Sequence, residues 1–325
     1  MRKISMRQAI NEALHIALNS DGTIFTCGED LAAYGGQLRC SYGLLEHFGE
    51  KRVFDTPISE AAIIGLGVGA SMLGLRPVLE LSYIDFIGTC FDQILNQMAK
   101  IRYMYGGNVS LPLVLRTQCG AGLGNGAQHS QSLEAILAHI PGIRVVMPSN
   151  AYDAKGLLLR AVRDNNPVLF IEHKALYKLK CEVPEEPYEC DYTCVVKRRG
   201  GHVTVAAYSA MVNQAMKAAE LLEQQGVETE IIDIRSLEPL DTDTIIQSVN
   251  RTGRFVMLHE ACLKGGFGGE IAATVQEACF SRLKAPIKRL GAPNVPVPFA
   301  PELEKEFLPG YPQVVDAVKA CMQYR

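Results

Sequence analysis

The segment Asp55-Thr-Pro-Ile-Ser-Glu60 is followed by an uncharged run, Ala61-Ala-Ile-Ile-Gly-Leu-Gly-Val-Gly-Ala-Ser-Met-Leu-Gly-Leu75. A helix that is apolar around its whole circumference is typical of a buried position, so this run predicts a helix enclosed on every side. Glu60 stands at the entrance of that helix, where partial desolvation can shift the pKa of a carboxyl group, and such groups are frequent in functional sites. The alternative is local: Ser59 caps the helix and Glu60 only complements the helix dipole.

Outside this segment, short apolar runs alternate with helical patterns, which is typical of parallel-sheet α/β architecture. The sequence predicts two doubly wound α/β domains, over residues 1–185 and 202–325, joined by a charged, proline-containing linker at 186–201. The predicted strands are 23–27, 77–81, 113–117, 144–147, 168–172, 202–209, 229–234, 254–259 and 287–290. The predicted helices, besides the one after Glu60, are 5–19, 86–105, 130–139, 151–164, 211–225, 241–251, 269–282 and 312–323.

Composition excludes several classes of protein. The chain has 325 residues, 48% of them apolar, and a formal net charge of −3, so no basic excess points to nucleic acid. Neither a signal peptide nor an apolar run long enough to span a bilayer is recognisable, so we expect no membrane partner and a cytoplasmic location. The ten cysteines lack metal-binding or redox spacing, and we expect them to be reduced and mostly buried.

Two carboxylates, Glu29 and Asp30, follow the strand predicted at 23–27. Open parallel sheets place ligand crevices at the carboxyl ends of their strands, so this pair indicates either a functional edge or a solvated loop. Phe86 is similarly open to two interpretations, a core residue or an aromatic stacking platform. For the glycine cluster Gly265–Gly269, at the start of a predicted helix, we expect a role in tight packing of helix on sheet.

A second glycine-rich stretch, Gly120-Ala-Gly-Leu-Gly-Asn-Gly126, leads to His129 and a predicted helix. It lacks the Lys-Ser/Thr ending of a P-loop and matches no dinucleotide fingerprint, so we reject a nucleotide phosphate site here. The remaining interpretation is a flexible loop that carries His129 into a cleft as an acid/base group.

Several segments together carry a resemblance to one family over essentially the full length. The chain resembles the beta subunit of the thiamine-diphosphate-dependent first component of 2-oxoacid and acetoin dehydrogenase complexes, in the transketolase-like superfamily. This resemblance implies a pyrimidine-binding domain followed by a smaller transketolase-like C-terminal domain. The segments are Gly28-Glu-Asp30, Asp55–Glu60, Phe91-Asp-Gln93, Gln128-His-Ser-Gln131, Asp153-Ala-Lys-Gly-Leu157, Arg163-Asp-Asn-Asn-Pro167 and Val297-Pro-Phe-Ala300.

The resemblance also implies roles for individual residues. The family's activating glutamate falls on Glu60, which would contact a ring nitrogen of the cofactor's aminopyrimidine. Phe86 would lie on the pyrimidine face, Glu29 and Ile58 would complete the cofactor contacts, and His129 would be the second catalytic residue. A monovalent cation, potassium, would be held by Leu113, Ala161, Val162, Asp164 and Asn166.

The chain contains no Gly-Asp-Gly, the segment with which the superfamily anchors magnesium and diphosphate. The resemblance therefore implies that an alpha subunit holds the magnesium ion, that the cofactor is shared in an α2β2 assembly, and that the C-terminal domain meets a lipoyl-bearing acyltransferase core. The implied reaction forms the cofactor carbanion and transfers the acyl group to the lipoyl arm.

The substrate is less sharply indicated. Residues 90–107 and 172–177 look like acetoin or pyruvate dehydrogenases, whereas residues 259–287 look more like branched-chain 2-oxoacid dehydrogenases. A Rossmann dehydrogenase fits poorly, because Gly65, Gly67 and Gly69 lie inside an apolar helix and not at a strand-to-helix turn. A non-catalytic scaffold subunit on the same fold is the remaining alternative, and it would need neither Glu60 nor His129.

Overall fold

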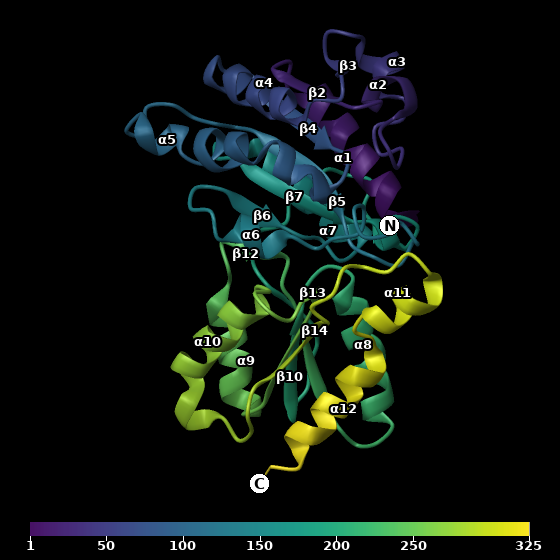
Figure 1. Cartoon of the computed structure of the whole chain (residues 1–325), viewed down its shortest axis with the longest axis vertical. Helices are drawn as coiled ribbons and strands as arrows, with labels where there is room; N and C mark the ends of the chain where they lie inside the picture. The colour runs from purple at the N-terminus through teal and green to yellow at the C-terminus, as the bar shows by residue number, and fades with distance from the viewer. Residues whose placement is uncertain (325) are drawn as a thin grey trace. The chain divides into compact units, whose positions relative to one another are not determined.

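The structure is a computed structural model that describes residues 1–324. The chain forms two compact units (Figure 1). Unit 1 comprises Met1–Cys119 and Ile136–Asp191, and unit 2 comprises Gly120–Ala135 and the chain from Tyr192 onward. The sequence did not indicate that the stretch around His129 belongs to unit 2.

Unit 1 contains a parallel sheet with the strand order β6-β7-β5-β4-β2-β3. In this sheet Gly28 of β2 is in register with Asp55 of β3 and Glu80 of β4. The carboxyl ends of these three neighbouring strands therefore lie together. The strands are β2 (Ile24–Gly28), β3 (Val53–Asp55), β4 (Arg76–Leu81), β5 (Val114–Cys119), β6 (Arg144–Val146) and β7 (Val168–His173).

Helices α1 and α7 of unit 1 pack side by side, and α4 packs against β4 and η2. The single helix expected at 86–105 is wrong: the structure has a 3₁₀ segment, a π-helix and one short α-turn there. The Ala99 amide bonds to the Ile94 carbonyl, five residues back, which is the π pattern. The bounds are α1 (Met6–Ser20), α2 (Leu31–Tyr34), α3 (Leu44–Phe48), α4 (Glu60–Met72), η1 (Ile84–Thr89), η2 (Gln93–Met98), α5 (Ile101–Met104), α6 (Glu134–Ala138), α7 (Ala151–Arg163) and η3 (Lys174–Leu176).

Helix α4 is enclosed on one face only. Its Gly67 allows close approach to the sheet, because a Cβ at that position would collide with the Leu79 side chain. The opposite face is open: Leu66 is 43% exposed, Leu73 at the helix end is 86% exposed, and nothing lies near Gly69. The expectation of a helix buried on every side is therefore wrong within this chain. An apolar helix that is only half covered has an unpartnered face.

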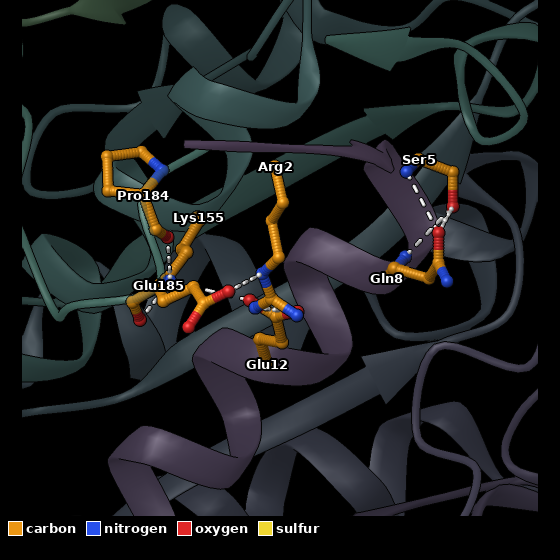
Figure 2. A network of polar contacts seen from close by, with 7 residues as sticks. All are labelled: Arg2, Ser5, Gln8, Glu12, Lys155, Pro184 and Glu185. Atoms are coloured by element: carbon orange, nitrogen blue, oxygen red, sulfur yellow. Dashed lines mark hydrogen bonds and ion pairs between the residues drawn. The ribbon is translucent and has the colours of Figure 1, made fainter. Parts of the chain in front are cut away.

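The amino terminus is fastened to α7 by a polar network (Figure 2). Strand β1 (Arg2–Ser5) pairs antiparallel with β8 (Lys180–Val183), near the end of the expected first domain. Lys155 of α7 is fully buried, and its ammonium group donates to the carbonyls of Pro184 at 2.7 Å and Glu185 at 3.0 Å. Its third contact is the Glu12 carboxylate of α1, at 3.4 Å.

Unit 2 contains a sheet of order β14-β13-β10-β11-β9, parallel except for β9. Helices α8 and α12 pack together on one side of this sheet and α9 and α10 on the other (Figure 1). The strands of this sheet are β9 (Val195–Arg198), β10 (Val203–Ala207), β11 (Thr229–Asp233), β13 (Phe255–Cys262) and β14 (Lys288–Ala292). Strand β12 (Ser236–Glu238) does not belong to it. The helices are α8 (Met211–Glu223), α9 (Thr242–Thr252), α10 (Gly268–Cys279), η4 (Phe280–Arg282), α11 (Pro301–Phe307) and α12 (Tyr311–Met322).

Two further expectations can be compared with the structure. All ten cysteines are free and most are buried, which confirms that expectation. Gly266 and Gly268 lie against the ring of His259 on β13, so the expected packing role of this glycine cluster is also confirmed. No helix within residues 1–324 is both long enough and apolar enough to cross a membrane.

Candidate active site

Three polar side chains gather at the carboxyl edge of the unit 1 sheet. Glu29 follows β2, Ser82 follows β4, and Glu60 begins α4 shortly after β3. The Ser82 hydroxyl donates to Glu29 Oε2 at 3.4 Å, and Glu60 lies close enough to Glu29 to influence its charge. The structure thus brings together two of the predicted residues, and Ser82 is a member that the sequence analysis did not name.

The pKa of the Glu29 carboxyl is raised, first by burial and then by the negative charge of Glu60. The hydrogen bond from Ser82 opposes this shift, and Asp30 adds to it weakly. A negative charge near a partly desolvated carboxyl disfavours its ionised form. Glu29 can therefore retain a proton at a pH where a solvated carboxyl has lost it.

Glu60 is half-buried at the first position of α4. Ser59 precedes it at the cap position, but its side chain makes no capping hydrogen bond. The alternative in which Ser59 caps the helix and Glu60 complements the dipole is therefore only partly met. The Cys90 thiol lies nearby: burial, and then the charge of Glu60, raise its pKa to about 12. Glu60 is therefore close enough to Cys90 and to Glu29 for its charge to raise the pKa of both groups.

The other predicted cofactor contacts lie in the same unit. Phe86 on η1 is half-buried and meets the ring of Tyr83 edge-on, with the ring centroids 6.2 Å apart. It is thus not a core residue, which favours the platform interpretation. Ile58, just before Glu60, is 82% exposed.

The loop predicted to hold a cation is occupied by an arginine. The Arg76 guanidinium donates to the carbonyls of Val162 at 3.0 Å and Asp164 at 3.1 Å. It also bonds to the Asn165 side chain. Two of the expected oxygen ligands therefore already accept hydrogen bonds from a positively charged group.

The remaining expected ligands are engaged as well. The Asp164 carboxylate pairs with Arg144 at 2.6 Å and accepts from the Asn166 side-chain amide at 2.9 Å. The carbonyls of Leu113 and Ala161 each accept a backbone amide. A cation would have to share these oxygens, since each carbonyl has a second lone pair. Within residues 1–324, no cluster of three or more His, Cys, Asp or Glu could hold a metal ion.

A buried charge network lies behind the carboxyl edge. Arg116 of β5 is fully buried and binds Glu172 of β7 through two hydrogen bonds, at 2.7 and 2.9 Å. Its third bond, at 2.8 Å, goes to Glu80 of β4, whose pKa is raised by burial. The sequence carried a signal for this network, because each of three neighbouring, largely apolar strands contains one of these charged residues.

His129 is half-buried and belongs to unit 2. The glycine-rich loop before it has positive φ angles at Gly120, Gly122, Gly124 and Gly126, a conformation that favours glycine. Two buried carboxylates bind backbone amides of this loop: Glu260 accepts the amide of Ala121 and Glu304 that of Gly124.

Comparisons with known proteins agree with this architecture. The transketolase pyrimidine binding domain matches residues 2–180, and the transketolase C-terminal domain matches residues 193–314. A beta subunit of acetoin:2,6-dichlorophenolindophenol oxidoreductase from Bacillus subtilis (strain 168) is 47% identical, covering 97% of this chain and 96% of that protein. A 2-oxoisovalerate dehydrogenase subunit beta from the same strain is 42% identical, with full coverage of both chains.

Two further matches complete the comparison. A pyruvate dehydrogenase E1 component subunit beta from Staphylococcus epidermidis (strain ATCC 35984 / DSM 28319 / BCRC 17069 / CCUG 31568 / BM 3577 / RP62A) is 40% identical, again with full coverage of both. Among solved structures, a split gene transketolase, an inactive beta4 tetramer, has a TM-score of 0.79 over 99% of this chain and 100% of its own, at 23% identity. At that identity the structural match supports the fold only.

Proposed function

Since this chain belongs to the transketolase-like family of dehydrogenase beta subunits, we propose that it is the beta subunit of a thiamine-diphosphate-dependent acetoin or 2-oxoacid dehydrogenase. The observation that carries the proposal is the half-buried pair Glu29 and Glu60 at the carboxyl edge of the sheet. Acetoin comes first as substrate, because the relative named for it has higher identity than those named for other substrates. A branched-chain 2-oxoacid is the second candidate, supported by the 2-oxoisovalerate dehydrogenase relative.

The site fits a flat heteroaromatic group with a protonatable ring nitrogen. Phe86 offers a half-exposed ring for stacking, and Ile58 offers an exposed apolar side chain beside Glu60. When bound, thiamine diphosphate supplies a nucleophilic carbon that also accepts the electrons of the cleaved bond. Glu60 would hold a proton against the pyrimidine nitrogen, and the nearby Glu29 carboxyl, with its raised pKa, helps to retain a proton in the pair.

The assembly we propose is an α2β2 heterotetramer. Its support is the unpartnered apolar face of α4, where Leu66, Gly69 and Leu73 are open to solvent. The missing Gly-Asp-Gly segment is the reason to place magnesium on the alpha subunit. It stays a prediction that the C-terminal domain contacts a lipoyl-bearing acyltransferase core. The cytoplasmic location also stays a prediction.

Potassium binding also stays a prediction. The carbonyls of Val162 and Asp164 lie together, as a monovalent cation requires, but they accept hydrogen bonds from Arg76. Potassium would therefore share the loop with that guanidinium group. Its effect on stability is the measurable consequence.

The test is reconstitution with the alpha subunit. We expect the beta chain alone to bind thiamine diphosphate weakly in calorimetric titration and to reduce no dichlorophenolindophenol with any substrate. With its alpha subunit, it should reduce the dye with acetoin, and to a smaller extent with pyruvate or a branched-chain 2-oxoacid. Dye reduction by the purified beta chain alone, in magnesium and cofactor, would contradict the shared site.

A further inference from the structure

We propose that Glu304 and Glu260 are positioning residues that bind the glycine-rich loop, residues 120–126, and thereby fix the place of His129. The catalytic consequence rests on the function proposed above, but the contacts themselves do not. Every contact used here lies within unit 2.

Glu304, on the short helix α11, binds the middle of the loop. Its side chain is 3% exposed, and Oε2 accepts the backbone amide of Gly124 at 2.9 Å. The second oxygen, Oε1, is buried and has no hydrogen-bond partner among residues 1–324. Burial of a carboxylate is unfavourable unless hydrogen bonds offset it, so the Gly124 amide is the contact that retains this side chain in place.

Glu260, at the end of β13, binds both ends of the segment that contains His129. It is 7% exposed, and Oε1 accepts the backbone amide of Ala121 at 2.7 Å. The same oxygen accepts the Ser132 hydroxyl at 3.4 Å. Because Ala121 precedes His129 and Ser132 follows it, one carboxylate restrains the chain on both sides of the histidine.

Apolar side chains also pack against the glycine-rich loop. Ala121 packs in a small buried cluster with Ala292, Val297 and Phe307. A Cβ at Gly126 would be 3.4 Å from the ring of Phe299, so this ring lies directly against the loop. The loop is therefore held from its first residues to its last glycine.

These contacts reduce the number of backbone conformations that the glycine-rich loop can adopt. A glycine samples more backbone conformations than any other residue, so an unrestrained loop with four glycines would place His129 in many positions. A catalytic group displaced by about 1 Å can lose about a hundredfold in rate. Charge-assisted bonds at Ala121 and Gly124 counter this freedom without contacting the reacting atoms.

The test compares Glu304→Ala, Glu304→Gln and Glu302→Ala in the assembly with the alpha subunit. The glutamine keeps an oxygen acceptor for the Gly124 amide, whereas the alanine removes it. Glu302 is an exposed residue on the same helix and serves as the matched control. Hydrogen exchange of peptides covering residues 119–132 reports the loop directly and needs no activity.

We expect Glu304→Ala to raise amide exchange at Gly124 at least about tenfold, and the glutamine to restore most of the protection. In the lipoyl-transfer assay, Glu304→Ala should lower kcat about tenfold and leave KM for the first substrate unchanged. In a His129→Ala background the same change should add less than about twofold, because residues acting through one another are not additive.

Two results would overturn the proposal. The first is unchanged loop exchange in Glu304→Ala. The second is an equal loss of kcat with and without His129. If instead no substrate is turned over by the wild-type assembly, the proposed function fails, and the exchange experiment still decides whether Glu304 holds the loop.

Discussion

His259 makes the stability of unit 2 depend on pH. The imidazole is fully buried on β13, stacks on the Tyr208 ring, and has Gly266 and Gly268 pressed against it. Within residues 1–324 no hydrogen bond of standard geometry satisfies either ring nitrogen. Burial is the main cause that lowers its pKa from 6.5 to about 4; the Ala261 backbone opposes the shift, and the charge of Arg289 adds to it.

The sign and size of the effect follow from linkage. Below pH 6.5 the unfolded chain binds a proton on this histidine, whereas the folded chain binds none until the pH approaches 4. The free energy of unfolding therefore falls as the pH falls through this window, by up to about 1.4 kcal/mol per pH unit. The loss should be about 2 kcal/mol between pH 7 and pH 5, and about 3 kcal/mol at pH 4.

The measurement is urea unfolding of the wild-type protein and His259→Asn at several pH values between 7 and 5. Asparagine leaves a cavity and lowers stability at every pH, but it cannot be protonated. The free energies of the two proteins should therefore converge by about 2 kcal/mol as the pH falls to 5. Parallel curves for the two proteins would show that His259 is protonated equally in both states, and the burial argument would be wrong.

Four further predictions concern unit 1 and the histidine loop. Glu60→Gln should abolish dye reduction without changing assembly, and a variant that retains more than about a tenth of the wild-type rate would refute its acid/base role. His129→Ala should lower lipoyl transfer far more than dye reduction, whereas equal losses would assign the histidine to an earlier step. Potassium should raise the melting temperature relative to tetramethylammonium at equal ionic strength. At a hundredfold excess over Kd, the free energy of unfolding should rise by about 2.7 kcal/mol. Asp164→Ala should remove this difference, and no difference in the wild-type protein would exclude the cation. Lys155→Met should lower the free energy of unfolding by about 2 kcal/mol, because the carbonyls of Pro184 and Glu185 and the half-buried Glu12 carboxylate lose their donor. Arg160→Met on the exposed side of the same helix should cost less than about 1 kcal/mol, and equal costs would contradict a special role for the buried lysine.

The elements that the sequence predicts best are long helices whose apolar residues recur at helical spacing over several turns. Helix α8 was expected at 211–225 and is Met211–Glu223, because its apolar residues recur at helical spacing. The π-helix η2 could not be predicted, since its hydrogen-bond pattern depends on packing and not on spacing. Strands β1 and β8 are four residues each and too short to show alternation. Their pairing joins the two ends of the expected first domain.

The candidate site was predictable to the extent that it follows sheet topology. The sequence placed Glu29 at the carboxyl end of a strand and Glu60 at the start of a helix, and only the family resemblance assigned both to one site. Strand β3, which precedes Glu60, was not predicted, because it is only three residues long. Neighbouring parallel strands bring their carboxyl ends together, which is how the structure brings Glu29 and Glu60 to one edge. The same rule applied to β4 would have identified Ser82. The restraint of the loop before His129 was not predictable, because Glu260 and Glu304 are more than a hundred residues away in sequence.

Helix α4 connects the chemistry of this chain to its assembly. Its first residue is Glu60, its inner face touches the sheet at Gly67, and its outer face presents Leu66 and Leu73 to solvent. An alpha subunit that covers the outer face would also exclude water from the first turn of the helix. Since burial already raises the pKa of Glu29, further desolvation would raise it more, and Glu29 would retain its proton to a higher pH. If the proposed assembly is correct, the separate chain would therefore lack the dry surroundings that the proposed role of Glu60 requires.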